Sequence, residues 1–261
     1  MSDLTALQLI QRVLTRTGAP KLPSTADHVS AGDPTQVVKG IAVTGQATLF
    51  ALHQAAEAGA NLILTYDPAF WASGDDLTRM QTDALFLEKR DFIRANNMVV
   101  FNLQDHLRDA VPDRIAQGMA QALEWQAETG NPNLFRRPPA TLLALAQELG
   151  RKLDDKTLRV VGDPKLPVSL VATRFGDTQE LTGIALLNGP ADVLVCGYAH
   201  EWEVVEYAQD MIATGAKKGL VLLGENASVQ AGMKSCAEWI KTFVSEVPVS
   251  FVSLPEPYWN P

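Results

Sequence analysis

The chain carries one structural unit twice, and this duplication limits the folds that it can adopt. Residues 40–68 and 192–226 each run from an apolar stretch through a glycine into a helix-like stretch, and then through a Gly-Ala turn into a second apolar stretch. The second helix-like stretch is longer by about one helical turn, which keeps the repeat in register. The pattern predicts a pseudo-symmetric pair of βαβ units. The alternative is that two unrelated βαβ units merely look alike.

The remaining segments extend this α/β pattern along the chain. Helix-like patterns cover 4–17, 77–96, 113–123, 141–153 and 231–244, and strand-like runs cover 98–103, 158–162, 169–175 and 249–253. Residues 129–140 contain three prolines and form the clearest break. We predict an α/β fold of two similar βαβ-containing halves with a cleft between them. Its predicted parts are a first half (1–130), a linker and bridging segment (131–190) and a second half (191–261).

Composition narrows the classes of function. The net charge is −8 and the pI is about 5.0, which argues against non-specific nucleic-acid binding, since that requires a basic surface. Apolar runs stay shorter than the roughly 18 residues of a membrane span, and the first residues lack a basic start and an apolar signal core. We therefore expect a cytoplasmic protein that binds neither nucleic acid nor membrane, with Cys196 and Cys236 as buried free thiols.

Acidic and imidazole side chains follow three of the expected strands. Asp67 follows the run 61–66, Asp105 and His106 follow 98–103, and Glu225 follows the last apolar run of the second unit. Carboxyl ends of parallel strands are where open α/β sheets place their sites, and carboxylate with imidazole is a ligand set for divalent metals. Each residue also has an ordinary interpretation, because Asp-Pro commonly starts a turn and a loop Asp-His commonly caps a helix.

His200 lies in the stretch His-Glu-Trp-Glu at the start of the second helix-like segment. It is a candidate for lining a pocket at the same edge, although capping and packing explain it equally well. The chain contains no GxGxxG, GxxxxGK[ST], GxSxG or CxxC pattern. Nucleotide-loop, serine-hydrolase and redox functions therefore have no motif support.

These strand ends resemble the NIF-three-like family, whose members are often labelled GTP cyclohydrolase I type-two homologues. One branch of that family has Thr-His-Glu-Pro-x-Phe, His-Asp-His, Pro-Asp, Glu-Trp-Glu, Gly-His, Ser-Glu and Ala-Gly-Met at corresponding places. The matching segments here are Thr65-Tyr66-Asp67-Pro68-Ala69-Phe70, Gln104-Asp105-His106, Pro112-Asp113, Glu201-Trp202-Glu203, Gly224-Glu225, Ser228-Val229 and Ala231-Gly232-Met233. The resemblance runs over most of the chain and implies an α/β fold of two similar halves, a dinuclear metal centre and a ring-like homo-oligomer.

The metal ligands that the resemblance implies are mostly replaced. Tyr66, Gln104 and Glu225 stand where the family has histidine, while Asp67 and Val229 stand where it has glutamate. Valine offers no donor atom, and tyrosine and glutamine are poorer metal ligands than imidazole. The dinuclear centre of the family is therefore not expected here.

Two interpretations follow from these replacements. In the first, the chain is a metal-poor ligand-binding or scaffold homologue to which no cofactor is assigned, and its partner is a small molecule. In the second, Asp67, Asp105, His106 and Glu225 hold one divalent cation (Mg²⁺, Mn²⁺ or Zn²⁺), and a bound water hydrolyses a phosphate- or nucleotide-like small molecule with His106 or His200 as base. Whether the chain is an enzyme, and what it binds, stay open at this point.

Overall fold

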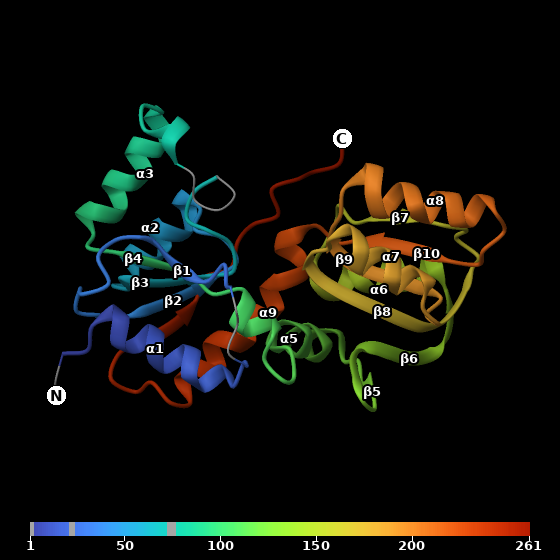
Figure 1. The fold of residues 1–261 in the computed structure, drawn as a ribbon, viewed down its shortest axis with the longest axis horizontal. Helices are drawn as coiled ribbons and strands as arrows, with labels where there is room; N and C mark the ends of the chain where they lie inside the picture. The colour runs from blue at the N-terminus through green and yellow to red at the C-terminus, as the bar shows by residue number, and fades with distance from the viewer. Residues whose placement is uncertain (1–2, 21–23, 72–76) are drawn as a thin grey trace. The chain divides into compact units, whose positions relative to one another are not determined.

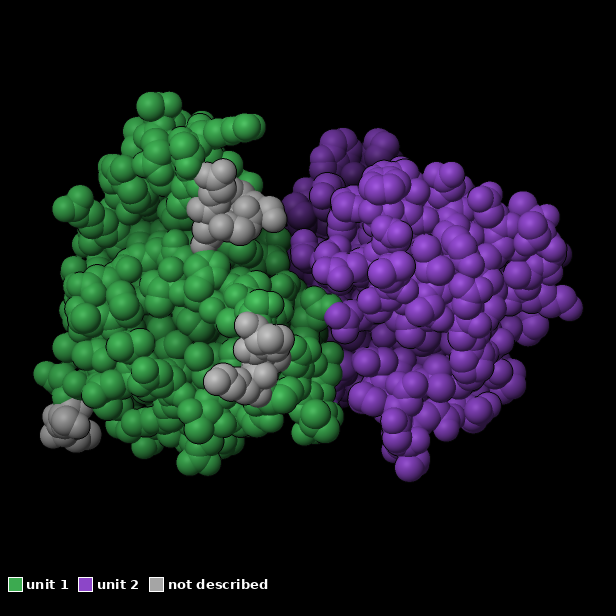
Figure 2. Space-filling model, in the orientation of Figure 1, with its two compact units in different colours: residues 1–115, 232–254 green, residues 116–231, 255–261 purple. Residues whose placement is uncertain are grey.

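The computed structural model describes residues 3–20, 24–71 and 77–261. The chain divides into two compact units, shown in Figure 2. The first unit comprises residues 1–115 and 232–254, and the second comprises residues 116–231 and 255–261. Each unit contains one β-sheet with helices packed on it (Figure 1). No helix among the described residues is long and apolar enough to cross a membrane.

The first unit contains a five-stranded sheet in the order β1-β4-β3-β2-β11. Strands β2, β3, β4 and β11 run parallel to one another, whereas β1 pairs antiparallel with β4 at the edge. The strands are β1 (His28–Ala31), β2 (Ile41–Thr44), β3 (Leu62–Thr65), β4 (Val99–Asn102) and β11 (Val249–Phe251), and the helices are α1 (Ala6–Thr17), α2 (Leu49–Glu57), the 3₁₀ turn η2 (Thr78–Met80), α3 (Ala84–Ala95) and the short α4 (Asp105–Arg108). Two further helices, α5 (Arg114–Leu123) and α9 (Glu225–Lys241), each contain residues of both units.

Helices α2 and α3 cover one face of this first sheet (Figure 1). Leu52 of α2 and Phe86 and Ile93 of α3 belong to one buried cluster with Ile63 of β3 and Val100 of β4. Strands β2, β3 and β4 are buried along their whole length, which explains their uninterrupted apolar sequences. Because the three strands are buried and paired in one sheet, their carboxyl ends lie at one defined edge of that sheet.

The opening helix begins and ends where local sequence signals predict. Thr5 caps α1 in a capping box with Gln8, and Gly18 ends the helix with a φ of 69°, a conformation that glycine adopts without strain. The apolar face, including Leu9 and Val13, is buried.

The second unit contains a six-stranded sheet in the order β5-β6-β8-β9-β10-β7. Strands β8, β9 and β10 are parallel, and the outer pairings are antiparallel. The strands are β5 (Ala127–Glu128), β6 (Asn131–Thr141), β7 (Arg159–Val161), β8 (Pro167–Asp177), β9 (Val193–Tyr198) and β10 (Gly219–Leu222), and the helices are α6 (Leu142–Leu153), α7 (Glu180–Asn188), the π-helical turn η3 (Glu201–Val205) and α8 (Glu206–Ala213). The segment expected as a linker, 131–190, thus forms β6, α6, β7, β8 and α7.

The duplicated βαβ unit is present in both sheets. In the first unit β2 and β3 are parallel neighbours connected through α2, and in the second unit β9 and β10 are parallel neighbours connected through η3 and α8. The α/β fold class is confirmed. Each copy places the residues that follow its strands at the carboxyl edge of its own sheet.

The proline-rich segment 129–140 was expected to break the regular structure, but most of it forms strand β6. Proline lacks the N–H that a central strand must donate, so it is tolerated at edges and bulges. Both conditions hold here. Pro138 and Pro139 lie where the register with β8 shifts between Arg136 and Ala140, and the outer neighbour β5 is two residues long.

Two helices differ from their expected bounds. The helix expected over 77–96 is divided, because Asp83 accepts a hydrogen bond from the Phe86 N–H at 2.8 Å and so caps α3 after the separate turn η2. Helix α9 begins at Glu225 rather than near 231. Gly224, with a φ of 83°, turns the chain directly from β10 into α9. Glu225 is therefore the first residue of a helix.

Both cysteines are free and buried, as the sequence predicts. Burial raises the pKa of each thiol, Cys196 and Cys236, to about 12.

Because the thiolate is the reactive form, we expect native protein to react negligibly with Ellman's reagent at pH 8, and unfolded protein to release two equivalents of thiolate chromophore. The variant Cys236→Ser should release one equivalent on unfolding. Rapid labelling of the native wild type would contradict the burial of these thiols.

Candidate functional site

Three parallel strands of the first sheet end side by side in buried polar residues. Thr44 of β2 is in register with Thr65 of β3, which is in register with Asn102 of β4. The segments after these strands stay hydrogen-bonded to one another, since the Gly45 carbonyl accepts the N–H groups of both Tyr66 and Asp67. The residues that follow β2, β3 and β4 therefore lie at one carboxyl edge, as the sequence predicts for Asp67, Asp105 and His106.

Asp67 is half-buried and hydrogen-bonded within the first unit. Its Oδ2 accepts a hydrogen bond from the Gln46 side-chain amide at 3.0 Å, and its backbone carbonyl accepts the Thr65 hydroxyl at 2.6 Å. A neutral amide donor thus contacts this carboxylate. The preceding residue, Tyr66, is completely buried, so a core aromatic ring occupies the position where the resembled family has histidine.

Asp27, which no sequence pattern indicated, organises the residues after β4. Its side chain is 1% exposed. Oδ1 accepts the backbone N–H groups of Gln104 and Asp105 at 2.7 and 2.8 Å, and Oδ2 accepts the N–H of His106 at 3.0 Å. These N–H groups belong to the start of α4, where intrahelical acceptors are lacking, so the carboxylate caps this short helix.

Asp27 also holds the imidazole of His106. His106 Nδ1 lies 2.8 Å from Asp27 Oδ2, a distance at which Nδ1–H donates to the carboxylate. A proton held on Nδ1 leaves Nε2 as the basic nitrogen of the neutral ring. The His106 side chain is 20% exposed, so an oriented imidazole reaches the surface at this edge. Carboxylate–histidine pairs of this kind orient both metal ligands and general bases.

Asp105 is tied to the same segment. Its Oδ2 accepts the N–H of Ala26 at 2.7 Å, and Asn102 donates from its side-chain amide to the Ala26 carbonyl at 3.0 Å. The segment before β1 is thereby fastened to the residues that end β4. The structure therefore brings Asp105 and His106 together on α4, with Asp27 and Ala26 as their partners.

The other sequence-predicted residues belong to the second unit. The backbone carbonyl of Glu225 accepts the Ser228 hydroxyl at 2.7 Å in the first turn of α9, and Val229 is completely buried. The imidazole of His200 is 51% exposed, lies 3.2 Å from a carboxylate oxygen of Glu203 and stacks on Trp202 with ring centroids 5.8 Å apart. His200 is thus a surface residue of an aromatic pair in this unit.

The candidate ligands do not form a ready-made cluster within either unit. Within residues 3–20, 24–71 and 77–261, no group of three or more His, Cys, Asp or Glu side chains is arranged to hold a metal ion. The ligand set Asp67, Asp105, His106 and Glu225 therefore stays a prediction. Its oxygen-rich donors would suit a hard divalent cation better than a soft one.

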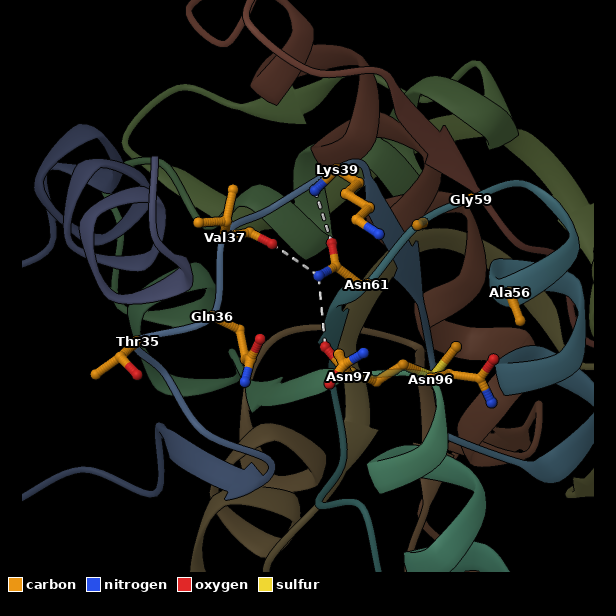
Figure 3. A pocket seen from close by; sticks show the side chains of 11 residues that line it. Thr35, Gln36, Val37, Lys39, Ala56, Gly59, Asn61, Asn96 and Asn97 are labelled. Carbon is orange, nitrogen blue, oxygen red and sulfur yellow. Dashed lines mark hydrogen bonds between the residues drawn. The ribbon is translucent and has the colours of Figure 1, made fainter. Parts of the chain in front are cut away.

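A hollow of about 460 Å³ lies at the opposite, amino edge of the first sheet (Figure 3). Asn61 is at its centre: its side-chain carbonyl accepts the Lys39 N–H at 2.7 Å, and its amide donates to the carbonyls of Val37 at 2.9 Å and Asn97 at 3.4 Å. All three polar contacts join loops that precede strands. Asn61 therefore has a structural role, and this hollow is distinct from the carboxyl edge.

The whole chain is similar in fold to several solved structures. A Bacillus cereus protein related to NIF3 matches with a TM-score of 0.79 at 13% identity, covering 100% of both chains. The Staphylococcus aureus protein SA1388 matches with a TM-score of 0.76 at 14% identity (99% of this chain and 100% of that one), and protein ybgI, described as of unknown function, with 0.74 at 20% identity (98% and 100%). No curated protein matches the sequence.

These similarities define an α/β protein with the fold of the NIF3-related structure. The model of the family Duf34/NIF3 (NGG1p interacting factor 3) matches residues 9–218, and the chain belongs to this family.

Proposed function

We propose that this chain is a metal-poor member of the Duf34/NIF3 family that acts as a ligand-binding protein or scaffold. The main support is how the acidic groups at the carboxyl edge of the first sheet are partnered. The Gln46 amide contacts Asp67, the Ala26 N–H contacts Asp105, and Asp27 accepts three backbone N–H groups together with His106. Donors of the protein itself thus contact these carboxylates where a metal centre would bring cations.

The nature of the replaced residues supports the same proposal. Tyr66 and Val229 are completely buried, and Val229 offers no donor atom. Restoring glutamate at position 229 would place a polar group where an apolar side chain is completely buried, which costs free energy unless that group is satisfied. The packing at position 66 is adapted to a tyrosine ring rather than to an imidazole.

Elemental analysis of protein purified without chelators tests the proposal. We expect well below one equivalent of bound divalent metal, and no rise in the melting temperature on adding Mg²⁺, Mn²⁺ or Zn²⁺, because an ion that binds the native state must stabilise it. One equivalent of metal together with a metal-dependent rise in melting temperature would overturn the proposal.

Variants that return family ligands give the positive control. The triple variant Tyr66→His, Glu225→His, Val229→Glu is expected to bind more metal than the wild type. If these buried changes prevent folding, the variant Gln104→His, Glu225→His, at two partly exposed positions, makes the same comparison. A folded variant that binds no more metal than the wild type would contradict the ligand positions inferred from the family.

A second candidate function rests on the orientation of His106 by Asp27. In it, Asp67, Asp105, His106 and Glu225 would hold one divalent cation, which would supply an activated water for hydrolysis of a phosphate- or nucleotide-like small molecule. His200 would serve as base, or His106 where its Nε2 is not bound to the cation. The metal analysis above distinguishes the two candidates, because this one requires about one equivalent of metal.

We also propose a homo-oligomeric, cytoplasmic protein, in keeping with the ring-like assembly that the family resemblance implies. Light scattering on the purified full chain tests the assembly, and a mass equal to one chain at micromolar concentration would contradict it.

A further inference from the structure

A second hollow in the first unit, of about 590 Å³, lies beside the end of strand β1 and beside helix α3. Its size falls within the range of small-molecule sites. Apolar side chains form much of its lining, including Phe70, Phe86, Ile93 and Met98. Asp67, Asp105 and His106, the candidate residues of the carboxyl edge, do not line it.

Both walls of this hollow are fixed by the fold. On one side, Gly32 has a φ of 88°, and a Cβ atom there would lie 2.1 Å from the Met98 carbonyl oxygen, so the chain after β1 passes directly against the start of β4. On the other side, Phe86 and Ile93 anchor α3 in the buried cluster on the sheet. A hollow between two anchored walls is formed before a ligand arrives, which reduces the entropy lost on binding.

The rim of the hollow carries two arginines one helical turn apart on α3. Arg90 uses two of its N–H donors on Asp91 in an exposed ion pair, and such pairs contribute little because water screens them. The guanidinium of Arg94, in the last turn of the helix, has no hydrogen-bond or ion-pair partner among the described residues. In the described part of the chain, the charged residues that line the hollow are Asp33, Arg90 and Arg94, which leaves one positive charge in excess on a chain whose net charge is −8.

The acidic residue on the same rim is directed at its own loop. Asp33 Oδ1 accepts the Thr35 N–H at 2.9 Å and the Thr35 hydroxyl at 2.7 Å. An entering ligand would therefore meet an apolar floor, carboxamide side chains from Gln36, Gln81 and Asn97, and the guanidinium groups of Arg90 and Arg94. A fork of guanidinium donors matches the two oxygens of a carboxylate.

We propose that this hollow binds an amphipathic monocarboxylate, with its hydrocarbon or aromatic body on Phe70, Phe86, Ile93 and Met98 and its carboxylate at Arg94, assisted by Arg90. The proposal rests on the ligand-binding function proposed above, for which it names a site and a ligand class.

Titration calorimetry of the full chain with decanoate, below the concentration at which it forms micelles, tests this site. Decanoate is expected to bind, decanol to bind at least tenfold more weakly, and decyltrimethylammonium more weakly still. The variant Arg94→Glu should weaken decanoate at least tenfold and leave decanol within about twofold. Arg79→Gln, which removes a charge from the neighbouring turn η2 but does not line the hollow, should leave both affinities unchanged.

Methyl NMR locates the bound molecule. Decanoate should shift the resonances of the Ile93 and Met98 methyl groups and leave those of Val195 and Leu220, in the second sheet, unchanged. Equal affinities for decanoate and decanol, unchanged affinity in Arg94→Glu, or no shift at Ile93 and Met98 would each overturn the inference. The proposed function would still hold in that event if the protein contains well below one equivalent of metal. One equivalent of bound metal would contradict the proposed function, whether or not decanoate binds.

Discussion

Replacing Asp27 with alanine is expected to lower the free energy of unfolding by about 3 kcal/mol. The carboxylate accepts three backbone N–H groups at the start of α4 and holds the His106 imidazole, and its side chain is 1% exposed. Alanine would leave these donors without their acceptor in a place that water reaches poorly. Hydrogen bonds to a charged group contribute more than neutral ones, and several are lost together.

Urea unfolding followed by circular dichroism measures the loss. Amide hydrogen exchange at Gln104, Asp105 and His106 shows whether the loss is local, because opening of α4 alone would speed exchange there before elsewhere. The conservative change Asp27→Asn, which keeps a side-chain acceptor, should cost less than Asp27→Ala.

Asp33→Ala serves as the matched control. Asp33 also accepts hydrogen bonds, from Thr35, but it does so in an exposed turn where water can replace it. Its loss should change stability by no more than about 1 kcal/mol. If Asp27→Ala is as stable as the Asp33→Ala control and exchange at α4 is unchanged, the proposed organising role of Asp27 is wrong.

The fold could be predicted where the signals are local. The duplicated βαβ unit was visible because buried parallel strands are continuous apolar runs, and glycines mark the turns between strand and helix. The bounds of α1 followed from Thr5 and Gly18, which act within one helical turn. Strand β6 was missed because Pro138 and Pro139 normally interrupt strands, and their tolerance depends on a register shift with β8 that sequence spacing does not encode.

The sheet edge at which Asp67, Asp105 and His106 lie could be predicted, but the contacts of these residues could not. Strand register alone carries Asp67, Asp105 and His106 to one edge, so locating the strand ends was sufficient. Asp27 was missed because it lies in a polar stretch, which is typical of a solvated turn. Its partners lie far along the chain, after β4. Gln46 was missed for the same reason, since its contact with Asp67 exists only once β2 and β3 are paired.

Buried Lys89 should make the free energy of unfolding depend on pH, and replacing Lys89 with methionine should remove this dependence. This residue of α3 is 3% exposed; its ammonium group donates to the Ala69 carbonyl and lies 5.5 and 5.1 Å from the rings of Phe70 and Trp71. Burial lowers its pKa from 10.5 to about 8. Between these two values the unfolded chain binds a proton that the folded chain does not, so the free energy of unfolding rises with pH.

The expected gain between pH 7 and pH 10 is about 2 kcal/mol for the wild type relative to Lys89→Met, measured by urea unfolding at both pH values. The comparison cancels the other lysines and the two buried thiols, which both proteins share. It also cancels the cost of leaving the Ala69 carbonyl without its lysine donor, because that cost does not depend on pH. Lys39→Met, which removes an exposed lysine of the same unit, should follow the wild-type pH dependence. If the free energy of unfolding changes equally with pH in the wild type and in Lys89→Met, then Lys89 keeps an ordinary pKa. Its ammonium group is in that case better solvated or paired than its burial beside Phe70 implies.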